Sequence, residues 1–296
     1  MTAHQEISRP DKVLYPEPGW TKADIAEHYE RVAGVLLPHL EGRPLVTHRF
    51  PDGVDDAGFF QKQAPAHPPV DTVRVPSGNT RGEVEHLLID DVEGLRFLAN
   101  QAAIELHRWL SRADGPGVDH PDLLVIDLDP PAKPALDALR ATARATRDLF
   151  TEIGLTPYLM ATGGSGYHVV APLDRSAGFD DARALARAIA DRLIVGDPDG
   201  LTVEQRKAKR GDRIFLDTNR NAYGQTVVVP YSPRARSGAP VAVPITWDEL
   251  GRVTPDGYDI ASVRRRLAQQ RDDPWAGMNG HAAAVADAAE ALRAMD

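Results

Sequence analysis

The stretch Leu123-Leu124-Val125-Ile126-Asp127-Leu128-Asp129-Pro130 decides how this sequence folds. A short continuous apolar run is typical of a buried strand, in which successive side chains point to opposite faces. Ile126 and Leu128 then enter the core, while Asp127 and Asp129 share the other face, roughly 7 Å apart along the strand. The sequence therefore predicts a core strand that presents two carboxylates at its tip.

Helical and strand patterns alternate closely on both sides of this strand, and no internal repeat interrupts them. Mixed elements of this kind predict an α+β, or mixed α/β, fold. The expected helices cover residues 21–39 with Thr21 as the cap, 92–101, 134–153, 179–194, 259–269 and 281–295. The expected strands cover residues 44–50, 83–89, 104–109, 157–161, 167–171, 213–216 and 226–229. No linker cuts the chain clearly, so we expect one catalytic domain over 1–296. Its internal division is an N-terminal subdomain of about 1–110, a catalytic subdomain of about 111–280 and an Ala-rich C-terminal helix at 281–296.

The composition limits the compartment and the metal chemistry. No apolar run reaches the roughly 18 residues that a membrane span needs, and the N-terminus lacks the apolar core of a signal peptide. We therefore expect a cytoplasmic protein with no membrane contact. The chain holds no cysteine. Disulfides, thiolate zinc sites and cysteine nucleophiles are excluded, and any metal must be held by carboxylate, imidazole or water, as Mg²⁺ and Mn²⁺ are.

Charge is distributed unevenly along the chain. The formal net charge of −9 argues against bulk coating of nucleic acid. Residues 206–236 nevertheless hold eight Lys and Arg residues against two Asp. This segment indicates a local site for a polyanion, although a solvated charged face would have the same composition.

Asp217 is the natural third carboxylate beside Asp127 and Asp129. It ends the strand-like Ile214-Phe215-Leu216 and lies within the basic segment. Three carboxylates suit two divalent cations about 3.5–4 Å apart, the arrangement used for in-line phosphoryl displacement. An Asp-x-Asp pair alone is weak, because such pairs also occur in turns without function. Its place at the tip of a buried strand favours the metal hypothesis.

Three further groups are candidate phosphate ligands. The loop Thr162-Gly163-Gly164-Ser165-Gly166 brings backbone N–H groups close to an anion, but by itself such a loop is more often a tight hairpin. His168 and His107 are plausible phosphate donors or proton carriers, or hydrogen-bonded structural histidines. Arg234 and Arg236 project from one face if the chain is extended there, as a triphosphate clamp requires.

Phe59 and Phe60 form an adjacent aromatic pair between an acidic turn and a Pro-rich stretch. Core packing is the default for such a pair. A stacking platform for nucleobases is the alternative, and the sequence does not decide between them.

Seven motifs occur together in an order that resembles one family, the polymerase domain of bacterial DNA ligase D, a branch of the archaeo-eukaryotic primase superfamily. The likeness runs from about Val13 to Gly280. The motifs are Asp11-Lys12-Val13-Leu14-Tyr15-Pro16, Phe59-Phe60-Gln61-Lys62, Ala103-Ile104-Glu105-Leu106-His107, Ile126-Asp127-Leu128-Asp129-Pro130, Gly163-Gly164-Ser165-Gly166-Tyr167-His168, Phe215-Leu216-Asp217 and Tyr231-Ser232-Pro233-Arg234-Ala235-Arg236-Ser237-Gly238-Ala239-Pro240.

The resemblance implies a primase-polymerase-like catalytic core of two packed sheets flanked by helices. It implies a catalytic, metal-binding triad of Asp127, Asp129 and Asp217. It further implies that the nucleoside triphosphate is held by His107, Thr162, Ser165, His168, Arg234 and Arg236, and that Phe59 and Phe60 stack on nucleobases. Lys12 and Lys22 are implied to recognise the 5′-phosphate of downstream DNA.

This sequence departs from the family pattern at the glycine loop. Many relatives carry Lys where this chain has Ser165, and Ser where it has Thr162, so a hydroxyl is kept and an ammonium is lost. At 296 residues the chain has no room for a ligase or nuclease domain. We therefore expect a stand-alone polymerase or an excised domain, with any partner ligase on a separate polypeptide or domain.

The residues and the resemblance together predict template-directed nucleotidyl transfer with two Mn²⁺ or Mg²⁺ ions and NTP or dNTP as substrate. The resemblance implies gap filling and primer extension at 5′-phosphorylated DNA gaps or ends, often with ribonucleotides, in end joining or excision repair. Ku and a ligase are the implied partners, and we expect a monomer acting at the bacterial nucleoid. Three other functions stay open: a primase that starts chains without a primer, a metal-dependent phosphodiesterase, and a non-catalytic module that binds 5′-phosphorylated DNA ends.

Overall fold

The computed structural model of the protein describes residues 6–78, 82–131, 136–270 and 272–295. The chain forms two compact units, and each is assembled from segments that are separated in the sequence. Unit 1 comprises Met1–Asp114, Thr226–Val243 and Asp256–Arg271, and unit 2 comprises Gly115–Gln225, Pro244–Pro255 and Asp272–Asp296. Each unit contains a sheet with helices beside it, so the mixed α+β class expected from the sequence is confirmed.

Unit 1 is built on an antiparallel sheet with the strand order β13-β7-β3-β6-β5, and β4 pairs with β3 outside this path. Its strands are β3 (Leu45–Arg49), β4 (Phe59–Gln61), β5 (Thr72–Pro76), β6 (Glu83–Leu87), β7 (Ala103–Trp109) and β13 (Thr226–Val228). A separate hairpin consists of β1 (Val13–Tyr15) and β2 (Trp20–Thr21). The helices are α1 (Lys22–Leu36), the 3₁₀ turn η1 (Leu37–His39), α2 (Val92–Asn100) and α6 (Ile260–Gln269).

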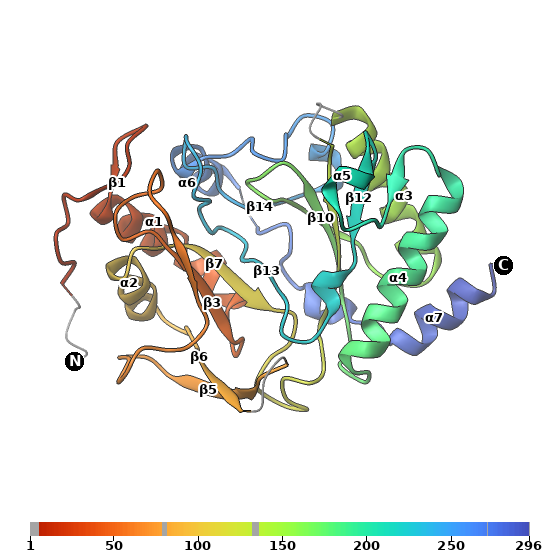
Figure 1. The fold of residues 1–296 in the computed structure, drawn as a ribbon, viewed down its shortest axis with the longest axis horizontal. Helices are drawn as coiled ribbons and strands as arrows, with labels where there is room; N and C mark the ends of the chain where they lie inside the picture. The colour runs from red at the N-terminus through yellow and green to blue at the C-terminus, as the bar shows by residue number, and fades with distance from the viewer. Residues whose placement is uncertain (1–5, 79–81, 132–135, 271, 296) are drawn as a thin grey trace. The chain divides into compact units, whose positions relative to one another are not determined.

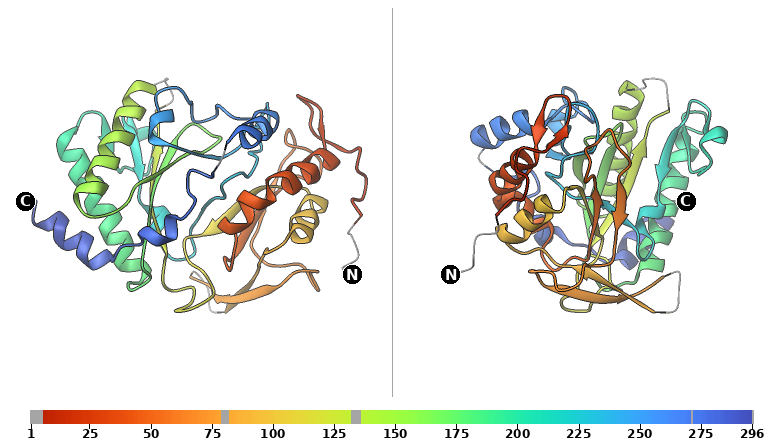
Figure 2. Two further views of the ribbon diagram at one scale, coloured as in Figure 1. Left: turned by 180° about the vertical axis from the view of Figure 1, so that it is seen from behind. Right: turned by 60° about the vertical axis from the view of Figure 1, so that its left-hand side comes forward.

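Helix α1 is fixed by its cap and by one apolar face. Thr21 and Asp24 form a reciprocal capping box, which satisfies backbone N–H groups at the start of the helix. The face predicted from the sequence is fully buried, since Ile25 and Tyr29 have no exposed surface. The Tyr29 hydroxyl also donates to the Ala103 carbonyl at 2.8 Å, which ties α1 to β7. Helices α1 and α2 lie side by side in unit 1 (Figure 2).

Unit 2 is built on a second sheet with the strand order β11-β12-β8-β10-β9-β14. Its strands are β8 (Leu123–Asp129), β9 (Tyr158–Ala161), β10 (Tyr167–Pro172), β11 (Leu201–Thr202), β12 (Ile214–Asp217) and β14 (Val243–Ile245). Its helices are α3 (Leu136–Glu152), α4 (Phe179–Gly196), α5 (Lys207–Arg210) and α7 (Val285–Arg293), with 3₁₀ turns η2 (Asn219–Asn221), η3 (Trp247–Glu249) and η4 (Met278–His281).

Strand β8 lies in the interior of the second sheet, between β12 and β10, as its apolar sequence predicts. Ile126 and Leu128 are fully buried. Helices α3 and α4 pack beside this sheet, and α7 packs against α4 (Figure 1). The sheet therefore has one heavily covered side, and the alternation along β8 sends Asp127 and Asp129 to the opposite side from Ile126 and Leu128.

Several short strands differ from the sequence-based expectation. Phe59–Gln61, for which the sequence predicts no strand, pairs with β3 as β4. Thr72–Pro76 (β5), Leu201–Thr202 (β11) and Val243–Ile245 (β14) were not predicted. Such strands are defined by their partners across the sheet and are too short to show a period of their own. The expected C-terminal helix is shorter, since residues 278–281 form a 3₁₀ turn and α7 begins at Val285. The predicted start of the helix at Pro134 lies outside the described residues.

Within the part of the chain that the structure describes, no helix combines the length and the apolar character that crossing a membrane requires.

Candidate active site

The three predicted carboxylates meet on the sheet of unit 2 because of strand register. Asp217 on β12 is directly opposite Asp127 on β8, and Asp127 is directly opposite His168 on β10. Residues opposite each other on antiparallel strands share a face, with Cβ atoms about 4.5–5.5 Å apart. Asp129 lies two residues further along β8 and therefore shares this face. The sheet thus collects three carboxylates and an imidazole in one place.

The carboxylates at this place have different proton affinities. Burial, followed by the negative charge of Asp127, raises the pKa of Asp129 to about 6. Burial also raises the pKa of Asp217, although Arg220 opposes the effect. Burial alone would raise the pKa of Asp127, but His168 and Arg220 together lower it below its ordinary value. Negative charge is therefore in excess here, which a bound cation would relieve.

Arg220 is the cation that the structure places among these carboxylates. Its Nε lies 3.2 Å from Oδ2 of Asp127 and 3.3 Å from Oδ2 of Asp217. On the other side of Asp127, Nε2 of His168 lies 3.4 Å from Oδ1. The sequence alone does not predict the contact of Arg220 with Asp127, because that contact depends on the pairing of β12 with β8.

The donor set fits a divalent cation chemically. Carboxylate oxygens are the ligands that Mg²⁺ and Mn²⁺ prefer, and strand pairing brings Asp127 and Asp217 opposite each other with Asp129 on the same face. In the described ranges no group of three or more His, Asp or Glu residues is already arranged as a metal site.

The glycine loop joins β9 to β10 in unit 2. At two of its positions the backbone requires glycine. Gly163 has a φ of 66°, which glycine adopts without strain. A Cβ at Gly166 would collide with the carbonyl oxygen of Leu128, so only glycine lets the start of β10 approach β8 this closely. The loop is therefore shaped by its fit to the carboxylate-bearing strand.

The loop uses part of its own hydrogen-bonding capacity. The Thr162 hydroxyl donates to the Gly166 carbonyl at 2.7 Å and accepts from the Gly164 N–H at 3.2 Å. The Gly163 N–H donates to the Pro255 carbonyl at 2.8 Å. Ser165 is exposed at the tip. The backbone N–H groups of Gly163 and Gly164 are thus already bonded within the protein, unlike those of an open phosphate cradle.

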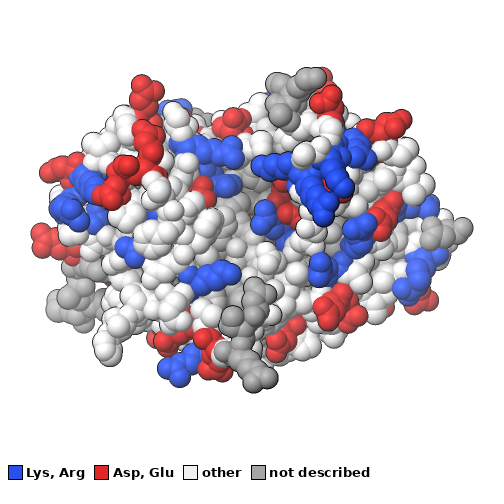
Figure 3. Space-filling view, in the orientation of Figure 1, with Lys and Arg blue, Asp and Glu red and all other residues white. Residues whose placement is uncertain are grey.

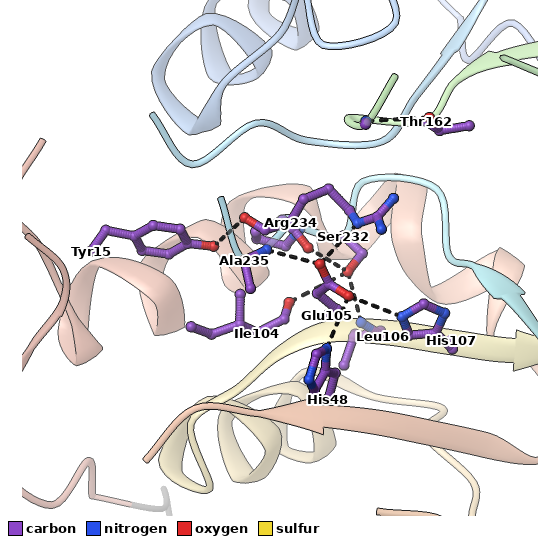
Figure 4. Close-up of polar contacts among 12 residues, drawn as sticks. Tyr15, His48, Ile104, Glu105, Leu106, His107, Thr162, Ser232, Arg234 and Ala235 are labelled. Carbon is purple, nitrogen blue, oxygen red and sulfur yellow. Dashed lines mark hydrogen bonds and ion pairs between the residues drawn. The ribbon is translucent and has the colours of Figure 1, made fainter. Parts of the chain in front are cut away.

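Two of the predicted nucleotide ligands of unit 1, His107 and Arg234, contact Glu105 on β7 (Figure 4). One carboxylate oxygen accepts from Nε of Arg234 at 3.1 Å and from the Ala235 N–H at 2.9 Å. The other lies 3.2 Å from Nε2 of His107 and 3.2 Å from Nδ1 of His48. Glu105 is therefore the common partner that orients two predicted triphosphate ligands.

Charge in this cluster is balanced by Glu105. Burial alone would raise the pKa of Glu105, but the hydrogen bond with His107 and the charge of Arg234 hold it far below its ordinary value. Burial lowers the pKa of His107, and Glu105 opposes this. Glu105 was not predicted as a site residue, although it lies within one of the family motifs. The signal for its role was the spacing Glu105-x-His107, which places both side chains on one face of a strand.

Arg234 and Arg236 do not lie on an extended segment, so alternation along a strand does not place their side chains on one face. The Arg236 N–H donates to the Arg234 carbonyl at 2.8 Å, which bends the chain tightly between them. The bend is needed because the Ala235 N–H turns inward to Glu105. Arg234 is mostly buried, whereas Arg236 is exposed.

Phe59 and Phe60 are exposed, so the core-packing alternative does not hold. Their exposed fractions are 46% and 58%. Phe60 stacks on His48 with ring centres 4.0 Å apart and meets His107 edge-on at 5.6 Å. The Arg49 guanidinium lies over the Phe59 ring at 5.3 Å. Large exposed rings held at a fixed orientation are suited to stacking.

Lys12 and Lys22 lie near each other in unit 1, since the Lys22 N–H donates to the Lys12 carbonyl at 2.8 Å. Burial lowers the pKa of Lys22, and the positive charges of Arg9, Lys12 and Arg49 lower it further. Lys22 Nζ donates to Ser8 and Asn100, and Lys12 Nζ pairs with Asp52 at 2.8 Å. A cluster of cations that repel one another would be relieved by an anion.

The basic segment of unit 2 forms a positively charged surface around α5 (Figure 3). A hollow of about 840 Å³ is lined there by Arg187, Arg206, Lys209 and Arg213 together with Thr202 and Glu204. Arg210 is partly committed to the fold, because its guanidinium stacks on Phe215 at 3.6 Å and donates to the Glu204 carbonyl. Positive charge is therefore concentrated here by Arg206, Lys209 and Arg213, whereas Arg234 and Arg236 of the same basic segment belong to unit 1.

The predicted site residues thus form two sets. Unit 2 carries Asp127, Asp129, Asp217, Thr162, Ser165 and His168, and unit 1 carries Lys12, Lys22, Phe59, Phe60, His107, Arg234 and Arg236. The roles of individual residues remain predictions.

Comparison with known proteins identifies the class. Residues 21–275 match the family model described as the LigD primase-polymerase domain. The structure is similar to a solved structure described as the polymerase domain from Mycobacterium tuberculosis ligase D in complex with DNA, with a TM-score of 0.86 and 35% identity, covering 94% of this chain and 99% of that one. The chain is therefore a nucleotidyltransferase of the primase-polymerase type.

The curated relatives define the family more closely. The multifunctional non-homologous end joining DNA repair protein LigD of M. tuberculosis is 36% identical over 272 residues, which are 90% of this chain and 36% of the relative. LigD of Pseudomonas aeruginosa is 34% identical over 282 residues, covering 94% of this chain and 33% of the relative. The chain belongs to the LigD primase-polymerase domain family, and it spans about a third of the length of these relatives.

Proposed function

We propose that this protein is a template-directed polymerase that fills short gaps and extends primers at 5′-phosphorylated DNA gaps or ends. Its proposed substrates are nucleoside triphosphates, with ribonucleotides favoured as the family resemblance implies. The observation that carries the proposal is the row of Asp217, Asp127 and His168 across three strands, with Asp129 on the same face. This arrangement supports chemistry on phosphate esters with the help of cations.

The proposed metal ligands are Asp127, Asp129 and Asp217. All three would hold the divalent cations through carboxylate oxygens on one face of the sheet. When bound, Mg²⁺ or Mn²⁺ supplies positive charge for the primer oxygen and the triphosphate. His168 would keep Asp127 oriented and ionised through their contact at 3.4 Å.

The proposed triphosphate ligands act by position and charge. Glu105 holds Arg234 at 3.1 Å and His107 at 3.2 Å, so these donors meet a substrate with little loss of side-chain freedom. Thr162 and Ser165 would contribute hydroxyl groups from the glycine loop. Arg236, which is exposed, would contribute a second guanidinium.

The proposed DNA contacts also lie in unit 1. Phe59 and Phe60 present exposed rings for stacking on bases, and Lys12 and Lys22 would bind the downstream 5′-phosphate. The mutual repulsion of the cations around Lys22 supports an anion at this place. The relatives carry non-homologous end joining in their names, and we extend that setting to this chain, with Ku and a ligase as partners. Excision repair would use the same gap-filling reaction.

Primer extension on a short-gapped duplex tests the proposal. Reactions with and without the downstream 5′-phosphate are compared, with NTPs or dNTPs and with Mg²⁺ or Mn²⁺. We expect templated extension that the phosphate stimulates and that Asp127→Ala abolishes while the protein stays folded. Asp191→Asn, an exposed ion-pair residue of α4, is the matched control and should keep full activity. An active, well-folded Asp127→Ala variant would contradict the assignment of the carboxylates.

A second candidate function is a non-catalytic DNA-end binder, which the cation cluster around Lys22 favours. It predicts no extension, together with 5′-phosphate-dependent binding that survives Asp127→Ala and is lost in Lys22→Met. Synthesis without a primer would instead indicate a primase, and degradation of the DNA would indicate a phosphodiesterase.

A further inference from the structure

Arg220 forms ion pairs with two of the proposed metal ligands of unit 2, and the proposed function assigns it no role. Its Nε lies 3.2 Å from Asp127 and 3.3 Å from Asp217, which are opposite each other on β8 and β12. The guanidinium therefore occupies the space between two proposed metal ligands. A guanidinium and a divalent cation cannot both fill that space.

The backbone that carries Arg220 is held firmly. Asn221 is buried, its Oδ1 accepts from the Val125 N–H at 2.9 Å, and its Nδ2 donates to the Val125 carbonyl at 2.7 Å. This pair of bonds fastens turn η2 to β8. The N–H of Asn219 also donates to Oδ1 of Asp217 at 2.9 Å. The Cα of Arg220 is thus placed next to the carboxylates whether or not its side chain touches them.

The side chain of Arg220 has freedom that its backbone lacks. It is 39% exposed, whereas the side chains of Asp127 and Asp217 are 9% and 14% exposed. Its two ion pairs are the polar contacts that join it to the row, and four rotatable bonds separate the guanidinium from the backbone. It can swing toward solvent without disturbing η2.

We propose that Arg220 is a built-in counter-ion: it holds Asp127 and Asp217 in place in the metal-free protein and is displaced when a divalent cation binds them. The inference rests on the proposed metal site and deepens it. Without a cation, buried carboxylates this close together repel one another and destabilise this part of the sheet. Arg220 reduces that repulsion with one positive charge, and a divalent cation replaces it with two.

The exchange has a consequence that can be measured without any catalysis. A metal that must displace a bound guanidinium binds more weakly than one that enters a vacant site. Removing the guanidinium should therefore tighten metal binding, while the loss of an ordinary structural residue would weaken it. The same change should make the metal-free protein less stable.

Titration with Mn²⁺ by calorimetry, at pH 8 where Asp129 is ionised, compares the wild type with Arg220→Gln. We expect Mn²⁺ to bind about tenfold more tightly to Arg220→Gln, the factor that corresponds to one charge-assisted hydrogen bond. In EDTA the variant should melt at a lower temperature than the wild type, and Mn²⁺ should raise its melting temperature by more. Arg220→Lys should lie between the two. Arg187→Gln, which breaks an exposed ion pair with Asp191 on α4, should leave Mn²⁺ affinity unchanged.

The outcomes separate this inference from the proposed function. If the wild type binds Mn²⁺ and Arg220→Gln binds it equally or more weakly, the counter-ion exchange is wrong while the metal site stands. If Mn²⁺ binds neither the wild type nor Arg220→Gln, the metal site itself fails, and both proposals fall together. Circular dichroism of each variant checks that a weaker affinity does not come from unfolding.

Discussion

Asp129→Asn should stabilise the metal-free protein at neutral pH although it removes a proposed catalytic group. Burial and the charge of Asp127 raise the pKa of Asp129 to about 6 in the folded protein, and an aspartate in an unfolded chain has a pKa of about 3.9. The folded state therefore holds the proton more tightly than the unfolded state. As the pH rises from about 4 to 6, ionisation of Asp129 makes folding less favourable.

The pKa of Asp129 differs by about two units between the folded and unfolded states, and this difference sets the size of the effect. Each unit corresponds to about 1.4 kcal/mol, and because Asp129 keeps contact with solvent we expect about 1–3 kcal/mol. An asparagine has the same shape and carries no charge, so it should recover this free energy above pH 6. Near pH 4 the aspartate is already protonated, and the gain should vanish.

Urea unfolding in EDTA, followed by circular dichroism at pH 7.5 and pH 4.5, measures the effect. Asp191→Asn is the control, because its exposed ion pair with Arg187 contributes at most about 0.5 kcal/mol. Saturating Mn²⁺ should stabilise the wild type more than Asp129→Asn. The reasoning is refuted if Asp129→Asn is less stable than the wild type at pH 7.5, or if its gain is the same at both pH values.

Two further predictions concern the groups that shape the site. Glu105→Gln should lower the free energy of unfolding by about 2–4 kcal/mol, because it removes the buried carboxylate that pairs with Arg234 and His107, and it should weaken nucleotide binding. Glu27→Gln, at a more exposed ion pair, should cost less than about 1 kcal/mol in the same urea titration, and equal costs would contradict the role of Glu105. Gly166→Ala should lower the free energy of unfolding by about 1–3 kcal/mol, because its Cβ meets the Leu128 carbonyl oxygen. Gly34→Ala, on the open side of α1, should instead raise it by about 0.5–1 kcal/mol. A Gly166→Ala protein as stable as the wild type would contradict the close approach of β10 to β8.

The elements with a strong local signal were predictable from the sequence. Strand β8 has a continuous apolar run, and α1 has a cap at Thr21 followed by an apolar face, so each is specified within its own segment. Strand β4 is different, because Phe59 and Phe60 are exposed and their strand exists through pairing with β3. A single sequence carries no record of that partner.

In the candidate site, too, only the features that lie within one segment were predictable. Asp127 and Asp129 follow from alternation along one strand, which the sequence displays. The contact of Arg220 with Asp127 depends on the register of β12 against β8, and the inward turn of Ala235 depends on Glu105 on another strand. Both are relations between distant segments, and motif spacing does not encode them.

Each unit is assembled from segments that lie far apart in the sequence, which limits how early in synthesis it can fold. Unit 1 takes its last segment from Asp256–Arg271, and unit 2 takes its last from Asp272–Asp296. Strand β7 receives its neighbour β13 only after all of β8 through β12 has been synthesised. Since a ribosome adds about 5–20 residues per second, the nascent polypeptide spends seconds with an unpaired strand edge open to wrong partners. Both units therefore close only after the segments 256–271 and 272–296, which lie more than 100 residues beyond β7 and β8, have been added.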